Sequence, residues 1–289
     1  MSSLRFGYGT NGFADHRLAD ALAVLADLGY HGVALTLDHQ HLDPFGPDLA
    51  GRTARVAARL AELGLAVVVE TGARYLLDPW RKHQPTLLSG PAGAARRVEL
   101  LRRAVQVGAD LGAEVVSFWS GTGSLDLPQP AGWRRLVAGC GQVLAAADRH
   151  GVRLGFEPEP GMFVATVAGY RRLAAELGQP DRFGLTLDIG HCRVLEPRPV
   201  PECVRDAAGE LVNVQIDDAR RGVHEHLPLG TGEIEFPPVL AALAELGYRG
   251  LVSVELPRHS HAAPELAGRS IRFLREVAAA GLAPLMPGR

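Results

Sequence analysis

The chain has 289 residues, of which 47% are hydrophobic and 21% are charged. This apolar content can fill one large core and excludes an intrinsically disordered chain. Thirty Lys and Arg against 32 Asp and Glu give a formal net charge of -2. Because the chain lacks the cationic excess that drives binding to a phosphate backbone, we expect no nucleic-acid partner.

The sequence also lacks the signals of a secreted or membrane protein. Its longest apolar stretches are about half of a membrane span, and the start MSSLRFGYG has no basic region followed by an apolar one. We therefore expect a cytoplasmic protein without membrane contact. The three cysteines, Cys140, Cys192 and Cys203, have no CxxC spacing, which predicts plain thiols rather than disulfides or a zinc knuckle.

A four-residue pattern of Ala, an acid, Leu and Gly recurs along the chain. It is typical of a helix end, because the Leu closes an apolar face and the Gly supplies the left-handed residue after the last turn. RHG, at 149–151, predicts a further helix end. The five copies of the pattern lie at residues 26–29, 61–64, 109–112, 175–178 and 244–247.

Eight strands are predicted, each followed by a stretch with helical periodicity. Their near-continuous apolar runs are typical of strands that are buried on both faces. The runs are RFGYGT, GVALTL, AVVVET, EVVSFW, VRLGFE, FGLTLD, LVNVQI and GLVSVE. Eight such units in 289 residues predict a single-domain (β/α)8 TIM barrel over residues 1–289.

A doubly wound open sheet is the structural alternative. That fold usually has a glycine-rich phosphate-binding turn after its first strand. Here the turn is GYGTNGF, which lacks the Walker Lys. We interpret it as a plain loop before a helix that begins at Asp15.

Two long loops follow strand carboxyl ends, the face on which barrel active sites are built. They cover residues 71–93 and 217–236. The first is either a lid that touches an anionic or polyhydroxylated substrate or an insertion packed over the third helix. It carries Arg74, Tyr75, Trp80, Arg81, Lys82 and His83. The last residues, 283–289, are expected to fray.

Polar residues end the last four strands, where a purely structural barrel does not need them. They are Glu157, Asp188, Gln215 and Glu255. Three carboxylates at one rim repel one another and raise each other's pKa unless a cation joins them. All-oxygen ligation suits Mn or Mg. The alternative for each residue is a rim carboxylate bonded to the backbone or to an Arg.

The segments FEPEPG, TLDIGH, VQIDD, LGTGEIEF and SVEL resemble the xylose isomerase-like barrels. This family includes sugar epimerases, hydroxypyruvate isomerase, inosose dehydratase and endonuclease IV. The resemblance implies one divalent metal held by Glu157, Asp188, Gln215 and Glu255. Gln215 matches the hydroxypyruvate isomerase branch and weakens a zinc assignment, although Co or Zn stays possible. An Arg six positions past the seventh-strand ligand grips substrate in epimerase branches, and here it is Arg221.

The resemblance also makes Glu157 and Glu255 acid–base groups. The metal would polarise a carbonyl and its neighbouring hydroxyl, and the two carboxylates would move a proton through an enediolate. We therefore predict an isomerase or epimerase of a small sugar, cyclitol or hydroxy-keto compound. The alternatives are an inosose-type dehydratase, an endonuclease IV-like phosphodiesterase and a non-catalytic binding barrel. A homo-oligomer stays open.

Several other residues are predicted to contact substrate. In endonuclease IV, histidines that end strands three and four help to form a three-metal cluster, but this chain has Glu70 and Trp119 there. Trp119 is placed to pack against a sugar. His191 and His226 are expected to bind a second metal, sugar hydroxyls or carboxylates. His224 is read as a solvated loop residue.

Overall fold

Eight parallel strands close into a barrel in the computed structural model, which describes residues 4–281. The predicted tail 283–289 lies outside these residues. The order around the barrel is β1-β10-β7-β6-β5-β4-β3-β2, so the (β/α)8 prediction is confirmed and the open sheet is excluded. The strands are β1 (Arg5–Gly9), β2 (Gly32–Thr36), β3 (Ala66–Glu70), β4 (Val116–Trp119), β5 (Leu154–Glu157), β6 (Phe183–Asp188), β7 (Leu211–Ile216) and β10 (Leu251–Val254).

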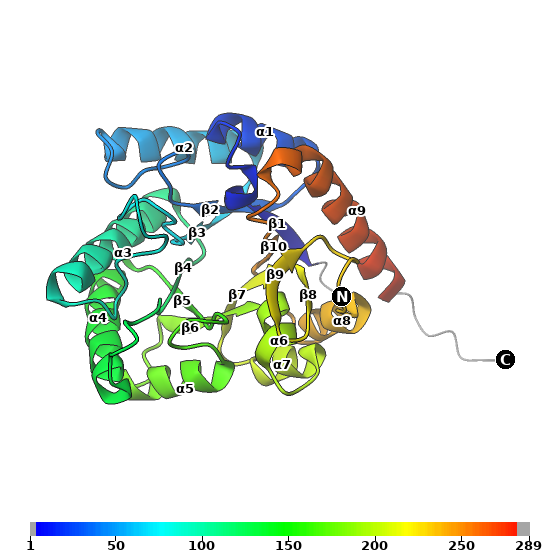
Figure 1. The fold of residues 1–289 in the computed structure, drawn as a ribbon. Helices are drawn as coiled ribbons and strands as arrows, with labels where there is room; N and C mark the ends of the chain where they lie inside the picture. Colours follow the sequence, from blue (N-terminus) through cyan, green and yellow to red (C-terminus); the bar gives the residue numbers. More distant parts are fainter. Residues whose placement is uncertain (1–3, 282–289) are drawn as a thin grey trace.

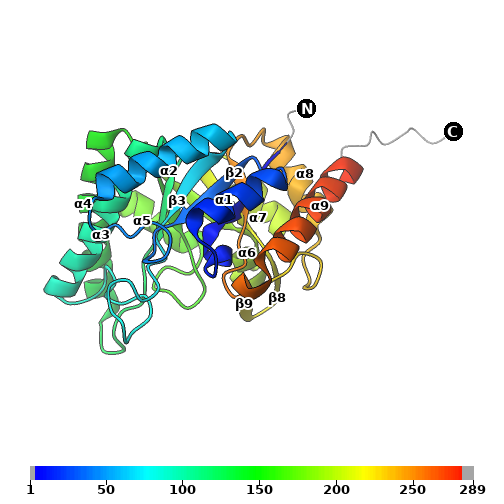
Figure 2. The ribbon, with the colours of Figure 1, turned by 90° about the horizontal axis from the view of Figure 1, so that it is seen from above.

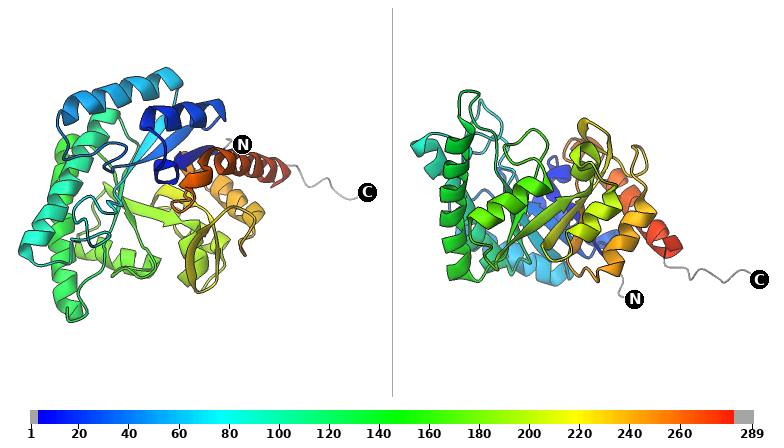
Figure 3. Two further views of the ribbon diagram at one scale, coloured as in Figure 1. Left: turned by 45° about the horizontal axis from the view of Figure 1, so that its top comes forward. Right: turned by 90° about the horizontal axis from the view of Figure 1, so that it is seen from below.

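The helices form a ring outside these strands (Figures 1 and 3). They are α1 (Leu18–Asp27), α2 (Leu49–Leu63), α3 (Pro91–Leu111), α4 (Gln129–His150), α5 (Val167–Glu176), α6 (Ile189–Leu195), α7 (Val200–Asp206), α8 (Phe236–Glu245) and α9 (Ala263–Gly281), with short 3-10 helices η1 (Thr10–Phe13) and η2 (Ser260–Ala262). Among the described residues, no helix is both long and apolar enough to cross a lipid bilayer. The three cysteines are buried free thiols.

The predicted helix ends are all observed. At α2 and α3, Gly64 and Gly112 take left-handed φ angles of 65° and 64°, and their N–H groups donate to carbonyls of the last helical turn. The predicted start of the first helix at Asp15 is wrong, because α1 begins at Leu18. The turn before α1 instead contains η1, which covers Thr10–Phe13. The buried Phe13 ring packs edge-on against Tyr8.

The loop after β7 contains a hairpin that the sequence analysis missed. Its strands are β8 (Asp218–Arg220) and β9 (Val223–Leu227). Asp218 anchors the hairpin, because its carboxylate accepts hydrogen bonds from the N–H groups of Gly230, Gly232 and Ile234. Figure 2 shows the hairpin at the same end of the barrel as the loop after β3. This end therefore carries both long loops over the carboxyl ends of the strands.

Candidate active site

A cavity of about 410 Å³ opens among the carboxyl ends of the strands. It collects seven of the nine residues that the sequence analysis selected. Asp188 lies buried next to the lining, and Arg221 does not reach the cavity. The seven lining residues are Glu70, Trp119, Glu157, His191, Gln215, His226 and Glu255.

Strand pairing explains why the four predicted metal ligands converge. Asp188 at the end of β6 is in register with Gln215 on β7, and Glu255 follows β10, which pairs with β7. Asp188 belongs to two groups of potential metal ligands, one with Glu157 and His191 and one with His226 and Glu255. Within each group the ligand atoms lie within 4.8 Å of one another.

The donor set fits a divalent cation. The Oδ2 atom of Asp188 and the Oε1 atom of Gln215 are buried and have no hydrogen-bond partner among the described residues. Leaving a buried acceptor unpaired costs about 1–3 kcal/mol. Two such oxygens on paired strands, beside two further carboxylates, are what hard-cation ligation requires.

Burial and mutual repulsion shift the carboxyl groups strongly. Burial raises the pKa of Glu157 well above its ordinary range, and the charges of Glu255, Glu159, Asp188 and Glu70 add to the shift. Burial also raises the pKa of Glu70 to about 8, with Glu255 adding repulsion. A bound cation would reverse these shifts by favouring the ionised forms.

Three histidines form a cluster against the carboxylates. His191 Nδ1 lies 3.3 Å from Glu157 Oε1, and its Nε2 lies 3.2 Å from His224 Nε2. The prediction of a solvated His224 is wrong, because β9 holds its half-buried ring against His191. His191, His224 and His226 themselves form a group of potential metal ligands.

The charge states of these histidines differ because their neighbours differ. Burial lowers the pKa of His191 to about 4, which keeps its imidazole neutral. Burial acts in the same direction on His226, but the adjacent Asp217 carboxylate outweighs it and raises the pKa to about 10. His226 was expected to bind a second metal, sugar hydroxyls or a carboxylate. It contacts the Asp217 carboxylate.

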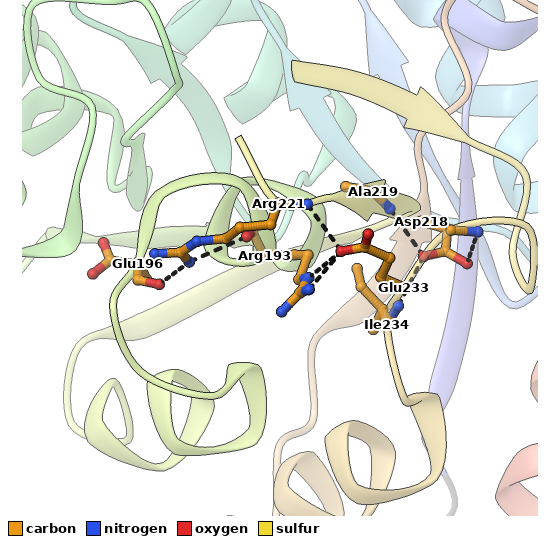
Figure 4. Close-up of polar contacts among 8 residues, drawn as sticks. Arg193, Glu196, Asp218, Ala219, Arg221, Glu233 and Ile234 are labelled. Carbon is orange, nitrogen blue, oxygen red and sulfur yellow. Dashed lines mark hydrogen bonds and ion pairs between the residues drawn. The ribbon is translucent and has the colours of Figure 1, made fainter. Parts of the chain in front are cut away.

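Arg221 is turned away from the cavity. Its guanidinium donates to the backbone carbonyls of Arg193 and Glu196, and its own N–H donates to Glu233 Oε2 at 3.0 Å (Figure 4). Arg193 also binds the Glu233 carboxylate, at 2.5 Å. In this arrangement Arg221 ties the hairpin to α6, and its predicted grip on substrate stays a prediction.

The loop after β3 contributes part of its charge to the cavity. Arg74, Tyr75, Lys82 and His83 line it, whereas Trp80 is 90% exposed and Arg81 pairs with Asp78. This division supports the lid interpretation for one part of the loop only.

Several residues of the site carried no signal that the sequence analysis used. Asn11 Nδ2 donates to Glu255 Oε1 at 2.9 Å, yet Asn11 belongs to the turn interpreted as a plain loop. Arg97 of α3 is buried with its guanidinium 4.9 Å from the Trp119 ring, and it donates to the carbonyls of Pro85 and His83. Glu159, two residues past Glu157, also lines the cavity.

Metal-free protein should lose stability as pH rises from 6.5 to 8. Glu70 and Glu159 have folded pKa values of about 8 against an ordinary 4.5, and His226 about 10 against 6.5. In this window the folded state holds more protons than the unfolded chain, so each group lowers the unfolding free energy by up to about 1.4 kcal/mol per pH unit. The lowered pKa values of His191 and His83, about 4, act in the opposite direction, mainly below pH 6.5, where the unfolded histidines are protonated.

Urea unfolding in EDTA at pH 6.5 and pH 8 measures this loss. A sample with excess Mn is the control, and its pH dependence should be smaller. Equal or greater stability of the metal-free protein at pH 8 would contradict the electrostatic description of the site.

Residues 22–277 match the family model described as the xylose isomerase-like TIM barrel. The chain belongs to this family. A member from Mesorhizobium japonicum, an L-ribulose 3-epimerase, is 30% identical over 225 residues, which span 76% of this chain and 70% of that protein. The xylose isomerase of Thermus caldophilus is 28% identical over 253 residues, spanning 81% of this chain and 63% of that protein.

Two solved structures share the fold. An L-ribulose 3-epimerase has a TM-score of 0.78 at 24% identity and covers 96% of both chains. The IOLI protein with a bound zinc atom has a TM-score of 0.75 at 16% identity, covering 97% of this chain and all of that one. At these identities the likeness extends to the fold alone.

Proposed function

We propose that this protein is a divalent-metal-dependent epimerase or isomerase of a small ketose or a related polyhydroxylated compound. The observation that carries the proposal is the pair Glu157 and Glu255, which line one cavity beside Asp188 and Gln215. Two carboxylates in one cavity allow a proton to be removed and returned by different groups.

Glu157, Asp188, Gln215 and Glu255 are the residues that would hold the metal. Three carboxylates and one amide oxygen favour Mn or Mg over softer ions. When bound, the ion would polarise the substrate carbonyl and its neighbouring hydroxyl and so acidify the adjacent C–H bond.

Proton transfer falls to the two glutamates in this proposal. Glu255 is held by the amide of Asn11, and Glu157 lies beside the neutral imidazole of His191. One carboxylate takes the proton next to the carbonyl, which leaves an enediolate, and the other protonates it. Return to the opposite face of the same carbon gives an epimer, and return to the adjacent carbon gives an aldose–ketose isomer.

The rest of the lining suits a polyhydroxylated ligand. Trp119 offers an aromatic surface for the C–H face of a sugar, and the Arg97 guanidinium packs against its ring. The polar side chains Glu159, His226 and Lys82 surround the same space. The relative with 30% identity is an L-ribulose 3-epimerase, which makes L-ribulose the first substrate to try.

The test is to incubate the Mn-loaded protein with L-ribulose, other ketoses and inosose, and to separate the products. The expected result is conversion of a ketose to its epimer or its aldose isomer. Loss of water from inosose would favour the dehydratase alternative. No conversion, together with no affinity for Mn, would favour a non-catalytic binding barrel.

Gln215→His should shift metal preference toward Zn or Co. Imidazole is a softer ligand than an amide oxygen, and Gln215 Oε1 is a buried acceptor without a hydrogen-bond partner among residues 4–281. Competition between Mn and Zn, followed by metal analysis of the protein, measures the preference. Gln142→His, the same substitution at an exposed position of α4, is the control, and an unchanged Mn-to-Zn ratio in Gln215→His would place Gln215 outside the ligand set.

A further inference from the structure

A second cavity, of about 640 Å³, lies at the opposite end of the barrel. Its lining comes from the amino ends of the strands and the ends of α3, α4 and α8, and it shares no residue with the catalytic cavity. Nothing in the proposed epimerase reaction uses this space. Its size lies in the range of about 300–1,000 Å³ that is usual for small-molecule sites.

Four arginines line this cavity, which we call the basal cavity. Arg5 begins β1, Arg153 and Arg182 directly precede β5 and β6, and Arg249 comes two residues before β10. Since β1, β10, β7, β6 and β5 are consecutive around the barrel, the arginines share one side of its base. In a chain with a net charge of -2, this is a local concentration of positive charge.

Internal partners account for part of this charge. Arg5 Nη1 donates to Glu114 Oε1 at 2.7 Å, and Glu114 is the one carboxylate among the described lining residues. Arg182 Nη1 donates to the carbonyl of Gly151 at 3.0 Å, at the end of α4, and its Nε lies 3.6 Å from Asp148 Oδ1 in an exposed ion pair. The carbonyl groups at the carboxyl end of a helix repel anions. The hydrogen bond from Arg182 offsets this repulsion at the end of α4.

Arg153 stands outside these pairs. The exposed side chain of Arg153 makes no hydrogen bond or ion pair with any other residue of the described range 4–281. Its guanidinium, which stays charged at any physiological pH and presents several donors in a plane, suits a phosphate or carboxylate group.

Part of the remaining lining of the basal cavity is apolar. The partly exposed apolar side chains are those of Leu211, Val212, Leu246 and Tyr248, whereas Val115 is buried. Inorganic phosphate alone would leave the exposed parts of Leu211, Val212, Leu246 and Tyr248 uncovered, whereas an organic ligand would cover them and gain from their burial.

We propose that the basal cavity binds a small phosphorylated organic molecule, with its phosphate at Arg153 and Arg182 and its less polar part against Leu211, Leu246 and Tyr248. The site is separate from the catalytic cavity, so the ligand is not the substrate. Guanidinium recognition of the phosphate makes binding sensitive to salt, because exposed charges are screened over about 10 Å at 0.1 M.

Calorimetric titration of the metal-loaded protein with AMP tests this proposal, with adenosine and inorganic phosphate as comparison probes. We expect AMP to bind at one site per chain, at least tenfold more tightly than either probe, and more weakly at high salt. Arg153→Gln should weaken AMP binding about tenfold or more, as expected for the loss of a charge-assisted bond. Arg134→Gln, an exposed arginine of α4 outside both cavities, should leave it unchanged.

Neither variant touches the catalytic cavity, so both should keep the turnover of wild type when AMP is absent. The proposal is overturned if AMP shows no saturable binding, if adenosine or phosphate binds as tightly as AMP, or if Arg153→Gln binds AMP as wild type does. Since none of these readouts is epimerase activity, failure here is distinct from failure of the proposed reaction.

Discussion

Glu157→Gln and Glu255→Gln should each lower turnover by more than the loss of one acid–base group does. That loss is roughly 10²- to 10⁴-fold. The excess is expected because each glutamate is proposed both to bind the metal and to carry a proton. The amide is nearly isosteric, so the barrel should remain folded. Steady-state kinetics with saturating Mn measures the loss.

Two controls separate chemistry from folding in this experiment. Glu225→Gln removes a carboxylate of the hairpin that pairs with Arg220 and does not line the cavity, and it should keep near-normal turnover. The melting temperature of metal-free Glu157→Gln should match or exceed that of wild type, because the amide needs neither a buried charge nor a proton held above the ordinary pKa of a carboxyl group. Turnover within tenfold of wild type in either cavity variant would contradict the assignment.

Asp188→Asn should abolish tight metal binding while leaving the fold in place. Asp188 Oδ1 accepts the N–H of His191 at 2.8 Å and so caps α6, and an asparagine oxygen can keep that bond. The carboxylate that belongs to both ligand groups is lost. Loss of a residue that only positions a metal ligand lowers metal affinity by roughly 10- to 100-fold. The fall in Mn affinity for Asp188→Asn should be larger.

Metal titration followed by electron paramagnetic resonance measures this affinity. Asp181→Asn is the matched control and should bind Mn as wild type does. Asp181 is an exposed carboxylate two residues before the amino end of β6. Wild-type affinity in Asp188→Asn would mean that the metal is held by other residues of the cavity.

The strand ends were predictable from the sequence because the physical rule behind them is simple. Buried parallel strands read as continuous apolar runs, and their carboxyl ends meet at one rim. A polar residue at the end of such a run, as at Glu157 and Asp188, is therefore placed to within one residue without any knowledge of the loops. The helix ends followed in the same way from the conformational freedom of glycine.

The missed features depend on contacts between distant segments. Asn11 meets Glu255 only because β1 pairs with β10, which joins positions 244 residues apart. His224 reaches His191 because residues 218–227 form a hairpin rather than an open loop. A local pattern contains neither fact. The spacing from Gln215 locates Arg221 in the chain but does not predict the direction of its long side chain, which binds backbone carbonyls outside the cavity.

The most direct test of the central proposal is turnover of L-ribulose in D₂O by the Mn-loaded protein, followed by mass spectrometry and NMR of the product. Proton transfer by Glu157 and Glu255 through an enediolate exchanges the abstracted proton with solvent. The proposal therefore predicts deuterium at the reacting carbon of the product, and no deuterated product in incubations with Glu157→Gln or Glu255→Gln. A product formed at the normal rate without deuterium would indicate direct hydride transfer and would contradict the assignment of the two glutamates as proton carriers.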